Sequence, residues 1–186
     1  MRFGAKRIAK RVQRGFTLVE LLIATLVLLV GIVAVMELVP RAMRANLNNR
    51  MNTTSTVIAQ RLTDLIMNAG VGANTLVDAS GTFPCGVIAP CSLGVPGGAV
   101  GTYQFGAPLL AGGQVDYAAG PVPGFRLIYQ DPNDATGGAY DVRWAVIASV
   151  EAVGPAGPVV VSKRYVVGVR RTDGTDAVTL TSWATR

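Results

Sequence analysis

An apolar stretch from Phe16 to Val39 with a carboxylate, Glu20, close to its start constrains this chain more than any other feature. As an α-helix rising about 1.5 Å per residue, these 24 residues are about 36 Å long, which is enough to cross a bilayer. An ionised side chain in hydrocarbon costs at least ~2.5–3.5 kcal/mol, so it persists where it finds a partner. Alternatively, Glu20 lies close enough to the helix end to reach the cytoplasmic interface. The sequence therefore predicts a membrane-spanning helix with an acid whose partner must be identified.

The positive charge of the chain is concentrated before this stretch. The formal net charge is +6, and a leader over residues 1–15 holds six of the 17 basic residues and no acid. The remaining chain has as many basic as acidic side chains, so it lacks the basic surface typical of nucleic-acid-binding proteins. The leader also predicts a cytoplasmic N-terminus and an external C-terminal part, which Arg41 and Arg44 oppose weakly. The six basic leader residues are Arg2, Lys6, Arg7, Lys10, Arg11 and Arg14.

The apolar stretch does not fit an ordinary secretory signal, in which an apolar core of ~7–15 residues precedes a small-residue cleavage site. Residues 36–41 read Met-Glu-Leu-Val-Pro-Arg, which are bulky and charged where an Ala-x-Ala pattern is expected. Cleavage after the stretch is therefore disfavoured. The length of 186 residues and the hydrophobic content of 50% indicate one modest domain beside the membrane segment.

A short motif at the start of the stretch resembles the signature of type IV pilin-like proteins. In that family a basic leader ends in glycine and is followed by Phe-Thr-Leu-x-Glu, and Gly15, Phe16, Thr17, Leu18 and Glu20 match in order. The resemblance implies that a prepilin peptidase cleaves between Gly15 and Phe16 and methylates the new N-terminal Phe16. It also implies that the amine of Phe16 pairs with Glu20 of a neighbouring subunit. Such a pair neutralises an expensive lone charge among apolar helices.

Residues 40–70 are expected to continue the helix as an amphipathic half. Pro40 removes a backbone donor and is expected to interrupt or kink the helix axis. The Asn- and Thr-rich residues 46–56 favour a bend or fraying, and Gly70 and Gly72 are expected to end the helix. Apolar and polar side chains recur at helical spacing on opposite faces. The apolar stripe comprises Met43, Leu47, Met51, Ile58, Leu62, Leu65 and Ala69, and the polar face comprises Arg44, Asn48, Asn52, Ser55 and Asp64.

The globular part, residues 71–186, begins with a Gly- and Pro-rich region over residues 71–124 that is expected to be dominated by ordered loops. Its hydrophobicity and lack of charge do not fit disorder. Cys85 and Cys91 are the only cysteines, and the charge rule places them outside the cytoplasm, so a disulfide is expected. Closing so short a loop contributes roughly 2 kcal/mol. Many pilins have a disulfide near the C-terminus, and the position of this pair in mid-chain departs from that pattern.

Residues 125–186 alternate with a period of two and predict an antiparallel meander. The expected strands are residues 125–129, 140–150, 163–172 and 177–185, with turn-forming residues at 131–138, 154–158 and 173–174. A long helix followed by this sheet gives an α+β ladle. The architecture that the pilin resemblance implies is the same.

The composition argues against an enzyme. The chain has no histidine, which removes Ser-His-Asp and Cys-His nucleophile systems and the commonest metal ligand. No phosphate-binding glycine loop is present. Asp131, Asn133 and Asp134 could gather around calcium, but Ala135 and Thr136 break the pattern and favour a turn. The carboxylate pairs Asp116 with Asp141 and Asp131 with Glu151 are explained by a solvated sheet edge, so no catalytic residue, metal or cofactor is predicted.

The expected function is a structural subunit of a type IV pilus or related filament. The Tyr-x-Val-x-Trp-x-Val pattern of residues 140–146, Arg170, Arg171 and the Thr-rich last strand resemble minor pilins of the pilus-modification kind. They also resemble minor pseudopilins of type II secretion. A third alternative is an uncleaved, signal-anchored envelope protein that binds a ligand through its glycine-rich region.

The resemblance also predicts partners and location. Other pilins or pseudopilins, prepilin peptidase, the inner-membrane assembly platform and membrane lipid are the expected partners. No general nucleic-acid partner is expected, and priming of assembly, adhesion and DNA uptake remain open as roles. The expected location is the bacterial inner membrane, with one membrane pass and a periplasmic C-terminal domain, followed by the pilus or pseudopilus.

Overall fold

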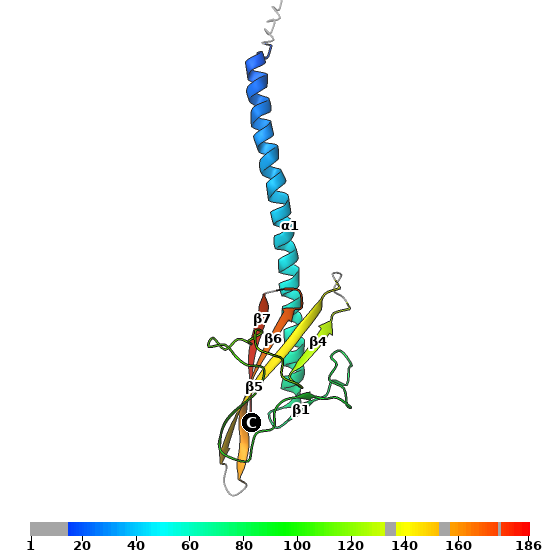
Figure 1. The fold of residues 1–186 in the computed structure, drawn as a ribbon, viewed down its shortest axis with the longest axis vertical. Coiled ribbons are helices and arrows are strands. Elements are labelled where there is room, and N and C mark those ends of the chain that lie inside the picture. Colours follow the sequence, from blue (N-terminus) through cyan, green and yellow to red (C-terminus); the bar gives the residue numbers. More distant parts are fainter. Residues whose placement is uncertain (1–14, 133–136, 153–156, 175) are drawn as a thin grey trace, which may run out of the picture. The chain divides into compact units, whose positions relative to one another are not determined.

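The computed structural model of the chain describes residues 15–132, 137–152, 157–174 and 176–186. The leader up to Arg14, Asn133 and Asp134 of the candidate calcium loop, and residues 154–156 of an expected turn lie outside them. The described chain contains one long helix and an antiparallel sheet (Figure 1), which confirms the α+β class. It divides into two compact units between Asn46 and Leu47.

The helix α1 spans Leu18–Ala69 and belongs to both units. It continues over residues 40–69 as expected, and the interruption expected at Pro40 does not occur. The fraying expected near residues 46–56 is also absent from α1. Instead, the hydroxyls of Thr53, Thr54 and Thr56 donate to backbone carbonyls four residues earlier, which satisfies them without leaving the helix. Gly70 follows the helix with a positive φ of 82°, the conformation that glycine adopts at helix C-termini.

The C-terminal part of α1 buries one face in the second unit. Ser55, Ile58, Ala59, Leu62 and Ile66 are its buried residues. They recur every three or four positions, as one face of a helix does. The expected placement of Ser55 on the polar face was therefore wrong. Of the expected apolar stripe, Leu65 is only partly buried and Ala69 is exposed. The buried face of the helix is therefore rotated relative to the stripe that the sequence spacing predicts.

The main sheet has five strands in the order β3, β5, β6, β7, with β4 also pairing with β5. β4 pairs with the first half of β5 and β3 with the second half, so both lie on the same side of β5. The strands β4 to β7 form the meander that alternation predicts. The strands are β3 (Gly101–Gly106), β4 (Arg126–Gln130), β5 (Ala139–Ala152), β6 (Pro158–Arg171) and β7 (Ala177–Thr185).

Three strands lie in the region expected to be loops. The pair β1 (Thr75–Leu76) and β2 (Cys91–Ser92) forms a separate two-stranded ladder, and β3 joins the main sheet. β6 also begins earlier than expected, at Pro158 rather than near Lys163. A proline is tolerated at the first position of a strand because its missing N–H is least needed there.

The sheet has a core on each face. On the side of α1, Trp144, Tyr140 and Tyr165 are fully buried in one cluster with Ile58 and Leu62 of the helix. On the other side, the segment before β4 covers Ala145 and Val166 with Val115 and Tyr117. A Cβ at Gly168 would lie 2.8 Å from the Val115 Cβ, so glycine permits this segment to approach the sheet.

Candidate functional site

The segment that contains the Gly-Phe-Thr-Leu-x-Glu motif leads into the start of α1, where the first turn is capped. Gly15, Phe16 and Thr17 precede α1, and the Thr17 Oγ1 accepts a hydrogen bond from the Glu20 amide at 3.2 Å. The Thr17 carbonyl accepts a bond from the Leu21 amide, also at 3.2 Å. Thr17 is therefore the N-cap, and the Thr-x-x-Glu sequence has the spacing of a capping box. This order fixes where the extended chain ends and the helix begins, two residues after the expected cleavage position.

Glu20 lies in the first turn of α1 and is exposed. A carboxylate there is stabilised by the positive end of the helix dipole, which accounts for part of its tolerance in an apolar segment. Among the described residues, the ion pairs include none to Glu20, whereas Glu37 further along α1 lies 3.8 Å from Arg41. Within the described chain, the carboxylate of Glu20 is thus available to a cation from outside.

The apolar side chains around Glu20 are not covered within the chain. Every residue from Gly15 to Arg50 is exposed, and Phe16 retains 80% of its accessible surface. The helix is long and apolar enough to cross a membrane by length and composition. Within this segment the Thr25 hydroxyl donates to the Leu22 carbonyl at 2.9 Å, so its polar group is satisfied locally. Lipid or other apolar helices must therefore cover this surface.

Gly15 makes no steric demand in the described structure. A Cβ added there would meet no atom within 4 Å, so packing does not explain the glycine.

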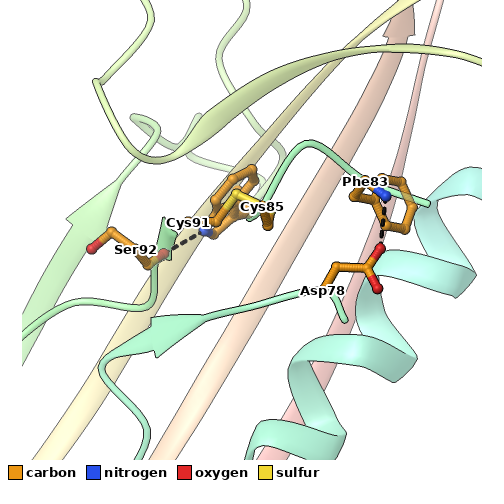
Figure 2. Close-up of a disulfide and its surroundings, with 6 residues drawn as sticks. Asp78, Phe83, Cys85, Cys91 and Ser92 are labelled. Atoms are coloured by element: carbon orange, nitrogen blue, oxygen red, sulfur yellow. Dashed lines mark hydrogen bonds between the residues drawn. A yellow bond between two sulfur atoms is a disulfide. The ribbon is translucent and has the colours of Figure 1, made fainter. Parts of the chain in front are cut away.

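The second feature of interest is the loop closed by Cys85 and Cys91, which form a disulfide with a Cα–Cα distance of 5.0 Å (Figure 2). Both cysteines are buried, whereas the residues between them are exposed. Val87 and Ile88 at the tip of this loop retain 83% and 101% of their accessible surface. The disulfide thus holds an apolar tip away from the core.

Buried polar groups attach this loop to the rest of the unit. The Asp78 Oδ2 accepts a bond from the Phe83 amide at 2.7 Å (Figure 2). The Asp78 Oδ1 accepts bonds from the amide and hydroxyl of Ser80. These bonds, chiefly that from the Ser80 hydroxyl, lower the pKa of Asp78. The Trp144 indole N–H donates to the Ser92 carbonyl at 2.8 Å. The Asp78 bonds order residues 78–83 just before the disulfide loop, and the Trp144 bond attaches the strand after the loop to β5.

The fully buried Lys163 joins two loops to the sheet. Its ammonium donates to the Ala73 carbonyl at 2.5 Å and lies 3.5 Å from the Leu93 carbonyl. Burial lowers the pKa of Lys163, because desolvation penalises the charged form. Its bonds to backbone carbonyls give it a structural role.

The sequence led us to expect Asp141 at a solvated sheet edge, and this expectation was wrong. Asp141 is buried. Its Oδ1 lies 2.8 Å from the Arg126 Nε, and its Oδ2 lies 2.9 Å from the Arg143 Nη2. The guanidinium groups of Arg143 and Arg170 lie over the ring of Tyr117, whose hydroxyl donates to the Asp141 carbonyl. The carboxylate is thus engaged by arginines. Its partner in the expected acidic pair, Asp116, accepts a bond from the Ala118 amide at 2.8 Å.

Sequence reasoning missed the capping role of Thr17 and the structural roles of Asp78 and Lys163. Thr17 could have been found from the Thr-x-x-Glu capping pattern, and Asp78 from the Asp-x-Ser spacing of a turn in which the side chain binds the backbone. No local pattern indicates Lys163, because its carbonyl partners lie 70 or more residues away. In the described segments, no group of three or more Cys, Asp or Glu side chains is placed to hold a metal ion.

A comparison with protein families matches residues 10–36 to the prokaryotic N-terminal methylation motif. The chain therefore carries a type IV pilin-like prepilin signature, and the match covers Gly15, Phe16 and Glu20. It supports a prepilin of the type IV pilin or pseudopilin type and implies processing by prepilin peptidase and assembly with other pilins. No curated protein and no solved structure matches the chain.

Proposed function

We propose that the chain is a minor pilin, cleaved after Gly15, anchored in the inner membrane by residues 16–39 and incorporated into a type IV pilus. The N-terminal methylation motif supports this proposal, and the capped, exposed Glu20 carries it. The six basic residues of the leader favour a cytoplasmic N-terminus and a periplasmic second unit.

The geometry of the helix start supports a pairing between subunits. Cleavage creates an amine on Phe16, immediately before the N-cap Thr17. A positive charge at the N-terminus of its own helix is disfavoured by the helix dipole. Glu20 of a neighbouring subunit offsets that charge, while the amine neutralises an acid that is costly in an apolar bundle. Extraction from the membrane and docking are thereby linked energetically.

Processing is tested by the mass of the mature protein isolated from cells with active prepilin peptidase. The expected mass is that of a chain beginning at methylated Phe16. Gly15→Val should retain the leader because a branched side chain obstructs the extended cleavage site. Gly31→Ala is the matched control, since a Cβ at Gly31 also meets no atom within 4 Å. An intact Met1 in the wild-type protein contradicts the proposal.

Assembly is tested with Glu20→Gln, which removes the charge but retains a side chain that suits a capping box. We expect normal cleavage and membrane insertion, together with a roughly tenfold or greater fall in the amount recovered in sheared pili. Glu37→Gln is the control because Glu37 lies on the same helix and is exposed beside Arg41. Equal recovery of the Glu20→Gln and Glu37→Gln proteins would reject the pairing.

A further inference from the structure

β7 is the outermost strand of the described sheet and pairs on one side only, with β6 (Figure 1). The pairing of β7 with β6 determines which residues of β7 direct their backbone N–H and C=O groups toward β6 and which direct them away. The Arg186 amide donates to the Val161 carbonyl at 3.0 Å and continues the β6–β7 register. Hydrogen-bonded and non-hydrogen-bonded pairs alternate in an antiparallel ladder. Every second residue of β7 therefore directs its N–H and C=O away from β6, namely Ala177, Thr179, Thr181, Trp183 and Thr185.

These outward groups form a free edge. Among the described residues, the backbone hydrogen bonds outside the strand ladders include none to β7 other than at its end through Arg186. A row of alternating donors and acceptors with strand spacing is complementary to the backbone of another extended polypeptide.

The free edge of β7 lacks the features that usually protect an edge strand. The nine residues Ala177–Thr185 contain no charged side chain and no proline, and their register with β6 has no irregularity. Natural edges are commonly blunted by charge, proline, bulges or short length. Threonine, valine, leucine and tryptophan also favour the extended conformation, so this edge is already organised for a further strand.

The side chains of β7 itself carry no charge, and the positive charge of Arg164 beside them is held over the ring of Trp183. Trp183 retains 61% of its accessible surface, and the guanidinium of Arg164 lies over its ring at 5.3 Å. Its neighbours on this face of β7, Thr179 and Thr181, are neutral. An added strand would cover Trp183 with a cross-strand neighbour, and aromatic residues pair well with β-branched ones there.

We propose that the free edge of β7 is a docking site for an extended, uncharged segment of another polypeptide chain, rich in β-branched residues, which extends the sheet by one strand. This interaction lies in the second unit and does not depend on the pairing of Glu20. It therefore adds a protein-binding surface to the proposed filament subunit.

A second copy of the chain is a less suitable occupant. Antiparallel pairing of two β7 strands places a two-fold axis perpendicular to the sheet, which reverses strand and helix directions between the copies. Residues 47–69 of α1 pack on the sheet, so their direction would be reversed as well. Copies that share one orientation, as subunits of a filament would, could then not pair through this edge.

The test uses the full chain in detergent micelles and a synthetic peptide of alternating threonine and valine whose ends are acetylated and amidated, so that the peptide is uncharged. The peptide is N-methylated along one edge, so it can pair through the other edge but cannot form fibrils. We expect a saturable blue shift of tryptophan fluorescence, because the peptide would cover the exposed ring of Trp183. The shift reports on Trp183 because Trp144 is already fully buried. Amide hydrogen exchange in Ala177–Thr185 should slow in parallel.

Thr181→Pro removes an outward N–H without removing a bond to β6, so it should retain the fold and weaken peptide binding about tenfold or more. Thr181→Val keeps the N–H and should bind like the wild type. Thr185→Pro, near the chain end, replaces Thr181→Pro if the latter does not fold. Peptide binding that is unaffected by proline, binding of a peptide methylated on both edges, or no binding at all would overturn the proposal. A dimer of the chain that Thr181→Pro abolishes, without peptide binding, would also overturn it.

Discussion

At the scale of single residues, the hydroxyl of Tyr165 is an unusual part of the core. Tyr165 is fully buried, and its hydroxyl oxygen has no hydrogen-bond partner among the described residues. Burial raises the pKa of Tyr165 to about 12 because desolvation penalises the phenolate. Since the ordinary pKa is about 10, the folded chain retains this proton more strongly than the unfolded chain between these values. The stabilisation is complete below about pH 10 and is lost as the pH rises through 12.

Tyr165→Phe should therefore leave the free energy of unfolding at neutral pH unchanged or slightly higher, because no described bond is lost. Above pH ~10 its stability should fall less steeply, by up to about 1.4 kcal/mol per pH unit. Urea unfolding across this pH range measures both effects. Tyr117→Phe provides a contrast, because it removes the bond to the Asp141 carbonyl and should lower stability at neutral pH as well. A Tyr165→Phe protein with the wild-type alkaline slope would contradict this account.

Single residues differ in how well the sequence predicts their environment. Glu20 and the residues around it were identified because an acid in an apolar stretch is conspicuous without any structure. Ser55 and Asp141 were misplaced because their environments come from distant parts of the chain. Ser55 is buried on the face of α1 that carries Ile58 and Leu62, and Asp141 meets Arg126 from a different strand. Side-chain type alone predicts exposure for both.

At the scale of elements, long regular segments were predicted well and short irregular ones were not. The amphipathic half of α1 and the strands β4 to β7 have clear periodicity, so their existence follows from the sequence. β3 was missed because its six residues begin and end in glycine within a Gly-rich region. It forms by pairing with residues 145–150 of β5, about 45 residues later, and no local pattern encodes that partner.

The disulfide stabilises the loop between β1 and β2 more than the sheet. Cys85→Ala combined with Cys91→Ala should lower the free energy of unfolding by roughly 2 kcal/mol on the chain-entropy model. Hydrogen exchange should become faster at the Asp78 amide, which donates to the Cys85 carbonyl at 2.7 Å, while the β5–β6 ladder stays protected. Thermal unfolding and exchange of the oxidised wild type, the reduced wild type and the double variant measure these effects. Equal stability of all three proteins would show that the bridge adds nothing to the fold.

At the scale of the whole molecule, the two units have different requirements. The second unit, Leu47–Arg186, contains every member of the main buried cluster, from Ile58 to Ala184. The described part of the first unit has no buried residue and needs a bilayer or neighbouring helices to cover its apolar surface. The chain thus combines a unit that has its own buried core with one whose apolar surface must be covered by lipid or by other subunits.

This division predicts the behaviour of two fragments. A fragment of residues 47–186 should fold cooperatively in water because it retains the face of α1 that packs on the sheet. A fragment of residues 70–186 lacks Ile58, Leu62 and Ile66, and losing each such side chain costs ~2–5 kcal/mol. Their sum is comparable with the total stability of a domain, about 5–15 kcal/mol, so the shorter fragment should not fold. Near-ultraviolet circular dichroism of the buried Trp144 during thermal unfolding distinguishes the two. A native signal from residues 70–186 would show that the sheet does not need the helix for its core.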